Sequence, residues 1–282
     1  MPSSSHSDTS HVTSPTLLSP DEPRAFECIR GDSASPIVLL CDHASNRIPE
    51  ALGTLGMADY QLGRSLAWDI GIYEVAATLS VRLDSPLIAT NYSRLVIDCN
   101  RPPESVESVP EVSEGVVIPG NRKIDPSDRR ARQVEVFWPY HQRISDVLNA
   151  RARKGVETVL VSLHSFNPVR GGCFRPWEIG VTYMNVNPLA SHLLATLDRS
   201  DHDLMVGDNE PYTVTPESDF VVPRHGEDRG LESVLIEIRQ DHLVQERDRR
   251  KWVERLAASL SSYVDRRATG QDRHPTREIG EW

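Results

Sequence analysis

The sequence predicts an α/β fold in which a mostly parallel, mixed sheet is flanked by helices, and two observations predict it. Short apolar runs rich in β-branched residues alternate along the chain with longer segments whose apolar residues recur at helical spacing. Such alternation is typical of parallel strands joined by crossover helices. In addition, no internal repeat and no Pro- or Gly-rich linker divides the 282 residues, so we expect a single domain.

The apolar runs are short, and polar or turn-forming residues bound each of them. Runs of this length and composition are typical of strands that are buried on both faces of a sheet. The predicted strands are 36–41, 86–90, 95–97, 158–163, 179–183, 204–206 and 233–238.

Four segments carry the helical period. In the first, Asp69 falls in the first turn, where the helix dipole favours an acid. Pro139 is expected to bend the second, long helix. Between these two helices, residues 102–124 are rich in Pro, Glu, Ser and Gly, which predicts a long excursion or lid. The predicted helices are 67–83, 126–154, 188–198 and 241–266.

The two ends of the chain are polar. Residues 1–24 are rich in Ser, Thr and Pro, which predicts a disordered tail, and residues 269–282 are expected to fray, so the predicted domain is 25–268. The first residues lack the positive start and the apolar stretch of a secretory signal. His6 and His11 lie in this tail and are therefore poor candidates for a site.

Bulk composition excludes two classes of partner. The net charge is −10, and Lys and Arg are scattered rather than grouped with aromatic residues, so we expect no nucleic-acid partner. No apolar run approaches the length of a membrane span. The four cysteines form no CxxC pair, which indicates reduced thiols in a cytoplasmic protein. Composition leaves the oligomeric state undetermined.

Polar residues stand where three predicted strands should be apolar. Asp42 and His43 follow the first strand, His164 follows strand 158–163, and Glu237 lies inside the last strand. In open α/β sheets, ligands collect at the carboxyl ends of strands. A single histidine at a strand end is more often a hydrogen-bonded structural residue. Two histidines together with a glutamate inside a strand favour a metal site instead.

A catalytic zinc ion needs three protein ligands and one open position. His43 and His164 supply two, and the third is Asn46 or Asp69. We prefer Asp69, because neutral Asn is a weak zinc ligand; the alternative role of Asp69 is that of a helix-capping acid. Asn46 is then expected to orient its loop or to hydrogen-bond water or substrate. Histidines in helical, turn or tail contexts are predicted to lie on the surface: His141, His192, His202, His242 and His274.

Arg94 and Arg101 flank a short apolar run, and Asn100 stands beside the second arginine. Guanidinium groups bind carboxylates through two parallel hydrogen bonds, so the pair predicts a clamp for an acidic substrate. The commoner fate of such arginines is a surface salt bridge. The run itself leaves both interpretations open.

An ordered set of strings resembles the N-formylglutamate amidohydrolase family over roughly residues 35–245. The strings are CDHASNRIP, AWDIG, NYSRLVIDCNRPP, SLHSF, GDNEPY and HGEDRGL followed by IEIRQD. The resemblance implies a fold similar to the zinc carboxypeptidases and the aspartoacylase-like amidohydrolases, one zinc ion per chain and a small acidic N-acyl amino acid as substrate. It implies His43, Asp69 and His164 as zinc ligands, Arg94, Asn100 and Arg101 as carboxylate-binding residues, and Glu237 as the proton-transfer residue.

The chain departs from the carboxypeptidase pattern at Asn46, where that pattern has a glutamate. Three further residues rank lower, because residues of this kind more often belong to the scaffold: Asn209 in a turn that would line the pocket, His225 in a loop where it would contact substrate or assist protonation, and Arg175 as an anion contact. With Arg94 stabilising the oxyanion and Glu237 moving the proton, the predicted reaction is hydrolysis of an N-formyl-glutamate-like amide. The alternatives are a zinc amidase or peptidase acting on another N-acylated or cell-wall-derived substrate, and a metal-binding regulatory homologue without catalysis.

Overall fold

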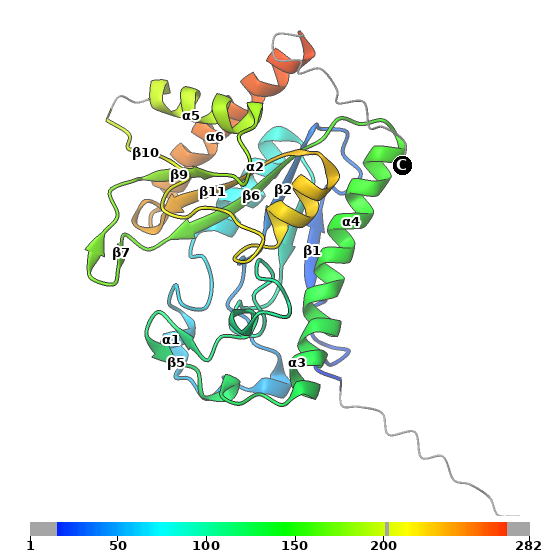
Figure 1. Ribbon diagram of the computed structural model, residues 1–282, viewed down its shortest axis with the longest axis vertical. Coiled ribbons are helices and arrows are strands. Elements are labelled where there is room, and N and C mark those ends of the chain that lie inside the picture. Colours follow the sequence, from blue (N-terminus) through cyan, green and yellow to red (C-terminus); the bar gives the residue numbers. More distant parts are fainter. Residues whose placement is uncertain (1–15, 201–202, 270–282) are drawn as a thin grey trace, which may run out of the picture.

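The computed structural model describes residues 16–200 and 203–269. A seven-stranded sheet lies at its centre, with helices on both faces (Figure 1). In spatial order the strands are β1 (Phe26–Ile29), β3 (Leu87–Thr90), β2 (Ile37–Cys41), β6 (Val159–Phe166), β11 (Glu232–Arg239), β9 (Ile179–Thr182) and β10 (Val206–Asp208). Only β1 against β3 and β9 against β11 are antiparallel pairs in this sheet of the described chain. The predicted mixed, mostly parallel sheet is therefore confirmed.

Three helices cover one face of the sheet: α2 (Ile72–Leu83), α5 (Pro188–Ser200) and α6 (Glu246–Ala268) (Figure 1). In α6, Trp252, Leu256 and Leu260 recur every four residues and form one apolar stripe. This stripe and the buried faces of α2 and α5 pack on alternate residues of the strands and make the larger core. The helix periodicity read from the sequence reflects this packing.

The other face is covered by a helical run interrupted by a π-helical segment. Helix α3 (Pro126–Arg132) leads into the π-helical residues Gln133–Phe137, and α4 (Trp138–Arg153) follows. Pro139 has no N–H to donate to the preceding turn, so the hydrogen-bond ladder widens just before it. The hydrogen-bond pattern of this helical run therefore changes just before Pro139, the residue at which a bend was predicted.

Several expected elements differ in detail. Residues 95–97 form a turn, and their apolar side chains are buried against neighbouring clusters rather than within a strand. The first helix begins at Ile72 instead of residue 67, so Asp69 precedes it. Strand β10 covers 206–208 instead of 204–206, and β1 was not predicted. Buried apolar runs of three residues do not distinguish a strand from a packed turn.

The predicted excursion 102–124 contains a small hairpin, β4 (Val112–Ser113) and β5 (Val116–Val117). Together with α1 (Asp59–Leu62) it forms the lower part of the molecule in Figure 1. At the hairpin tip, Glu114 accepts hydrogen bonds from Ser65 and from the side-chain amide of Asn167. The hairpin tip therefore contacts two chain segments, the one that precedes Asp69 and the one that follows His164.

The described chain is packed well before residue 25. Leu17 is buried, and the backbone N–H groups of Leu17 and Leu18 donate to the carboxylate of Glu135. The tail predicted for residues 1–24 is therefore too long by several residues; its residues 1–15, like most of the predicted C-terminal tail, lie outside the described ranges. Among the described helices, none is long and apolar enough to cross a membrane.

Candidate metal centre and active site

Two histidines and one aspartate meet at the carboxyl end of the parallel strands. His43 follows β2, and His164 lies within β6, two residues before the strand ends. Asp69 lies in the loop before α2. The backbone N–H of Asp69 donates a hydrogen bond to the His43 carbonyl. This loop hydrogen bond brings a residue 26 positions along the chain to the first histidine. All three side chains are buried.

The atoms that face one another in this cluster are nitrogen and oxygen atoms with lone pairs. His43 Nδ1 lies 3.1 Å from His164 Nδ1. Asp69 Oδ2 lies 3.5 Å from His43 Nδ1 and 3.2 Å from His164 Nδ1. Ligands bound tetrahedrally to zinc at its usual bond lengths are about 3.3 Å apart. The three separations match that spacing.

The partners of the other ring nitrogens decide the tautomers. His43 Nε2 lies 2.7 Å from Asp98 Oδ1, and His164 Nε2 lies 2.9 Å from Asp42 Oδ2. A carboxylate only accepts, so in neutral histidines both Nε2 atoms carry the hydrogen and both Nδ1 atoms present lone pairs. Two lone pairs and a carboxylate oxygen at van der Waals distance repel one another unless a proton or a metal cation lies between them. This donor set fits a divalent metal ion, and the carboxylate–histidine pairs are typical of metal sites.

Each of the two supporting carboxylates is itself held firmly. Asp42 accepts hydrogen bonds from the Tyr140 hydroxyl at 2.5 Å and from Ser162 Oγ at 2.7 Å. Asp98 accepts from the Asn100 backbone N–H at 2.9 Å and from Arg94 Nη2 at 3.2 Å. Neither aspartate was predicted from the sequence to have a role of its own. Each could have been recognised as an acid close in sequence to a predicted site residue. Asp42 precedes His43, and Asp98 lies between Arg94 and Arg101.

The cluster is strongly coupled electrostatically. Burial raises the pKa of Asp98, but His43 and Arg94 more than reverse this effect and hold the pKa well below its usual value. Burial also raises the pKa of Asp69, and the two histidines then lower it. For Arg94, burial lowers the pKa, whereas Asp98, Asp69 and the Tyr212 oxygen raise it above its usual value. The carboxylates are therefore charged and available to ligate a cation.

Asp69 does not cap helix α2. The residue before the helix is Gly71, whose φ of 79° is left-handed, and no side chain caps the first turn. A Cβ at Gly71 would lie 2.8 Å from the Leu243 carbonyl oxygen, so only glycine fits there. The Asp69 carboxylate instead accepts from the Ser165 N–H at 3.0 Å and from Arg94 Nη1 at 3.4 Å. Its remaining contacts are with the two histidines.

Glu237 lies beside the cluster on the neighbouring strand. It is the register partner of His164 in the parallel pair β11–β6, and 6% of it is exposed. Its Oε2 atom is buried and has no hydrogen-bond partner among the described residues. Burial raises its pKa to about 7, with Asp69 adding to this effect and the histidines and Arg94 opposing it. A buried, unsatisfied carboxylate beside a ligand set is typical of a proton-transfer residue.

The other predicted site residues divide into two groups. Arg94 contacts Asp69 and Asp98 and keeps a quarter of its side chain exposed. Arg101 donates to the Ser218 carbonyl, with its Nε 3.8 Å from Asp98. In contrast, the Asn46 amide donates to the Leu62 carbonyl, away from the three ligand atoms. Of the two residues considered for the third ligand, the arrangement favours Asp69.

Asn100 is engaged with the chain itself. Its amide nitrogen donates to Asp219, and its oxygen accepts from the backbone N–H groups of Phe220 and Val221. These bonds hold the loop whose Ser218 carbonyl accepts from Arg101. The structure therefore places Asn100 behind Arg101, where it holds the loop that contacts this arginine.

Asn209 begins a tight loop that lies on the sheet beside Glu237. Its φ is 52°, its Oδ1 accepts from the Tyr183 N–H, and a cis bond joins Glu210 to Pro211. The Glu210 carbonyl approaches Gly180 so closely that a Cβ there would overlap it. Gly180 is the register partner of Glu237. The loop 209–212 therefore forms a wall next to the proton-transfer candidate.

His225 and His141 form a buried, stacked pair with ring centroids 5.2 Å apart. The prediction of a surface position for His141 is wrong, because α4 turns this residue toward the sheet. His141 Nε2 lies 2.9 Å from the Cys99 carbonyl and Nδ1 lies 2.9 Å from His225 Nε2. A carbonyl only accepts, so the hydrogen bonds run from His225 through His141 to Cys99. Burial lowers the pKa of His141 to about 4 and that of His225 to about 3.

This histidine pair predicts acid sensitivity. The unfolded chain takes up protons near pH 6.5, whereas the folded pair stays neutral, so stability is complete above that pH and is lost as pH falls toward 4 and 3. For His225 the loss between pH 7.5 and 4.5 is about 2 to 3 kcal/mol. Urea unfolding of metal-free protein at these pH values measures it. The variant His225→Phe should show a flatter dependence; an unchanged slope would contradict the assignment.

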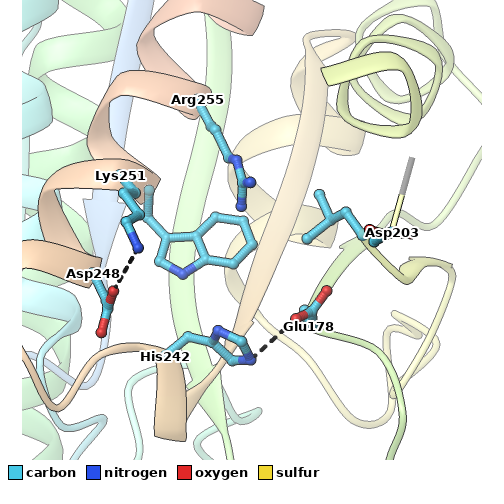
Figure 2. Close-up of a pocket in the computed structure, with 8 residues that line it drawn as sticks. Glu178, Asp203, His242, Asp248, Lys251 and Arg255 are labelled. Carbon is cyan, nitrogen blue, oxygen red and sulfur yellow. Dashed lines mark hydrogen bonds and ion pairs between the residues drawn. The ribbon is translucent and has the colours of Figure 1, made fainter. Parts of the chain in front are cut away.

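Two cavities lie apart from the His–Asp–His cluster. One, of about 760 Å³, is lined by Trp138, His141, Phe220 and His225 among others. The other, of about 180 Å³, lies beside α6, and Figure 2 shows its charged lining. There Lys251 pairs with Asp248 at 3.0 Å, and His242 lies 3.5 Å from Glu178 (Figure 2). Neither lining includes the three ligand residues.

Comparison with known proteins shows the family of the chain. Residues 35–244 match the family of N-formylglutamate amidohydrolases. A gene product of Agrobacterium tumefaciens with a crystal structure is 34% identical, with a TM-score of 0.85 over 88% of this chain and 98% of that one. An N-formylglutamate amidohydrolase from Ralstonia eutropha shares the fold, with a TM-score of 0.66, 16% identity, and coverage of 86% of this chain and 99% of that one. No curated protein matches the chain significantly. The chain belongs to the N-formylglutamate amidohydrolase family.

Proposed function

We propose that this protein is a zinc-dependent amidohydrolase that cleaves the amide of a small, acidic N-acyl amino acid such as N-formyl-glutamate. One observation carries the proposal. Three lone-pair donors converge at 3.1 to 3.5 Å beside a buried carboxylate that has no partner in the described chain. Such a set has the ligands of a metal and the base of a hydrolase in one place.

His43, Asp69 and His164 would hold the ion, one per chain. Asp98 and Asp42 keep the imidazoles in the tautomer that leaves Nδ1 free. When bound, zinc supplies Lewis acidity that polarises the scissile carbonyl and acidifies water. Nitrogen and carboxylate donors at tetrahedral spacing suit zinc better than magnesium or calcium, which prefer oxygen ligands.

Glu237 transfers the proton from the attacking water to the leaving nitrogen. Its carboxylate accepts a proton from the attacking water as the oxygen bonds to the carbonyl carbon, and it delivers that proton to the amide nitrogen as the carbon–nitrogen bond breaks. With an N-formyl substrate the products are formate and the free amino acid. Arg94 lies beside Asp69 and is partly exposed, so its guanidinium can stabilise the negative charge that develops on the carbonyl oxygen.

The carboxylate of the substrate is assigned to Arg101 together with Arg94. Both guanidinium groups are about a quarter exposed, and both form ion pairs with Asp98, which orients them. Asn100 acts through the loop that it holds. We assign Asn209 to the wall beside Glu237 and Asn46 to the loop after His43, whereas His225 lines the separate cavity of about 760 Å³; none of the three is assigned to the reacting atoms.

Metal analysis and substrate hydrolysis test the proposal together. Purified protein is expected to contain about one zinc per chain and to release formate from N-formyl-L-glutamate. Removal of the metal with a chelator should abolish turnover, and zinc should restore it where magnesium does not. N-acetyl-L-glutamate, N-formyl-L-methionine and a muramoyl peptide complete the panel.

Each outcome of that panel has a meaning. Preference for a muramoyl or a neutral N-acyl substrate would replace the acidic formyl substrate but keep the amidohydrolase. Stoichiometric metal without turnover of any member would support a binding protein instead. Protein that turns over N-formyl-glutamate at full rate after complete metal removal would overturn the role given to the cluster.

A further inference from the structure

Arg175 is a buried charge without a counter-ion. Its exposed fraction is 9%, and no salt bridge among residues 16–200 and 203–269 includes it. Its Nε donates to the Asn167 carbonyl at 2.9 Å, and its Nη1 donates to the Tyr212 hydroxyl at 2.7 Å. Burying a guanidinium without an anion costs free energy, so such a group is expected to meet one.

The other buried arginines show what a structural guanidinium looks like in this fold. Arg151 donates to the Thr158 hydroxyl and to three backbone carbonyls. Arg239 donates to the carbonyls of residues 175–177 and pairs with Asp241. Arg132 is bound to the Val96 carbonyl and the Asn121 side chain and is almost fully enclosed. Arg175 has fewer acceptors than Arg151 or Arg239 and is less enclosed than Arg132.

Arg175 lies beside the reacting cluster. Its guanidinium is 4.9 Å from the ring centroid of Phe166, which is two residues after His164 and on the same face of β6. Its partner Tyr212 ends the loop that lies on Gly180, and Gly180 pairs with Glu237. Arg175 therefore contacts a residue on the same strand face as His164, and Tyr212 belongs to the loop that packs on the strand partner of Glu237.

The pair is rigid and retains hydrogen-bonding capacity. The guanidinium lies against two rings, at 4.9 Å from Phe166 and 5.2 Å from Tyr212, which restricts its plane. Because Arg175 donates to the Tyr212 oxygen, the phenolic hydrogen remains for another acceptor. Arg175 Nη2 likewise has no acceptor in the described chain. A charged N–H and an O–H from adjacent, fixed groups together match a carboxylate.

We propose that Arg175 and Tyr212 form a second carboxylate subsite, which binds the side-chain carboxylate of the substrate while Arg94 and Arg101 bind the α-carboxylate. This inference rests on the proposed function and deepens it, because it predicts a preference for a dicarboxylic N-acyl amino acid. A substrate with a neutral side chain would leave the buried guanidinium without an anion, which costs free energy. The site would therefore favour acidic substrates both by attracting them and by disfavouring neutral ones.

Kinetics with two matched substrates test the subsite. N-formyl-L-glutamate carries the second carboxylate, and N-formyl-L-glutamine replaces it with an amide of the same shape. Arg175→Met is expected to lower kcat/KM for the diacid about 100-fold, the loss of one charged hydrogen-bonded pair, and to change the value for the amide by only a few fold. Tyr212→Phe should give a smaller loss, about 10-fold, with the same selectivity.

Arg170→Met is the matched control. Arg170 is an exposed arginine over the same Tyr212 ring, at 5.4 Å from its centroid, and the change removes an equal charge. We expect it to keep the preference for the diacid. If the control loses the preference to the same extent, or if Arg175→Met lowers both substrates equally, the subsite is wrong and Arg175 is structural or acts at long range.

Binding separates this inference from the proposed reaction. Calorimetry with zinc-loaded protein uses glutarate, which has both carboxylates, and butyrate, which has one. Tighter binding of glutarate that disappears in Arg175→Met supports the subsite even if no amide is hydrolysed. Hydrolysis of N-formyl-glutamate with unchanged glutarate binding in the variant overturns the subsite and leaves the reaction standing. Absence of both binding and hydrolysis overturns both.

Discussion

Replacing Glu237 with Gln is expected to lower kcat by about 10²- to 10⁴-fold, the range for removing a general acid–base group. Glutamine has the same volume and can still hydrogen-bond, but it cannot accept a proton. The chain should keep its fold, because Glu237 Oε2 has no partner in the described structure to lose. Zinc content and KM should stay near those of the wild type, since Glu237 is outside the ligand cluster.

Single-turnover rates and zinc content, measured on the same preparation, check this prediction. Glu232→Gln is the matched control, because Glu232 lies at the start of the same strand, away from the cluster, where it accepts hydrogen bonds from Tyr263 and Arg267 of α6. A wild-type rate in Glu237→Gln would make the residue structural. Loss of zinc in this variant would instead place Glu237 among the ligands.

The pH profile gives a second readout for the same residue. Burial raises the pKa of Glu237 to about 7, and a base works only when deprotonated. Activity should therefore be lost as pH falls through a value at or below 7, since a bound cation lowers this pKa further. The residual activity of Glu237→Gln should lack this acidic limb.

Replacing a ligand is expected to have the other large effect. His164→Ala removes one of three converging donors and should reduce zinc content to a small fraction of one per chain, with turnover falling below detection. Asp69→Ala should do the same, because its carboxylate faces both Nδ1 atoms. Asn46→Ala should keep the metal. Full zinc in Asp69→Ala together with its loss in Asn46→Ala would reverse the ligand assignment.

Asp42→Asn separates support of a ligand from ligation. An amide can no longer accept at both oxygens, so the Tyr140 hydroxyl and His164 Nε2 compete for one acceptor. The expected result is a 10- to 100-fold weaker zinc affinity, with full occupancy restored in excess zinc. Competition with a chromogenic chelator measures the affinity, and a circular dichroism melt with chelator present checks the fold. Unchanged affinity would show that Asp42 does not orient the ligand.

Local sequence determined most strands of the sheet and the position of three candidate site residues at or near its strand ends. The runs around residues 37–41, 159–166 and 232–239 are apolar and β-branched, so each could be read as a buried strand without knowledge of its neighbours. A charged or titratable residue inside or after such a run breaks the pattern. That departure identified His43, His164 and Glu237, because burying a polar group is costly and therefore rarely accidental.

Tertiary structure alone decided which polar residues meet, because contacts between distant segments leave no periodic trace. Asp42 and Asp98 looked like ordinary acids until the fold placed each against a histidine ring nitrogen. Arg175 was expected from the sequence as an anion contact, but only the fold shows it buried against Phe166 and Tyr212 without a counter-ion. Residues 95–97 show the converse. Their apolar side chains correctly predicted burial, but they form no strand, because a strand also needs a neighbouring strand with which to pair. Sequence thus determined what is buried, and the packing of separate loops at one sheet edge decided what each buried group can do.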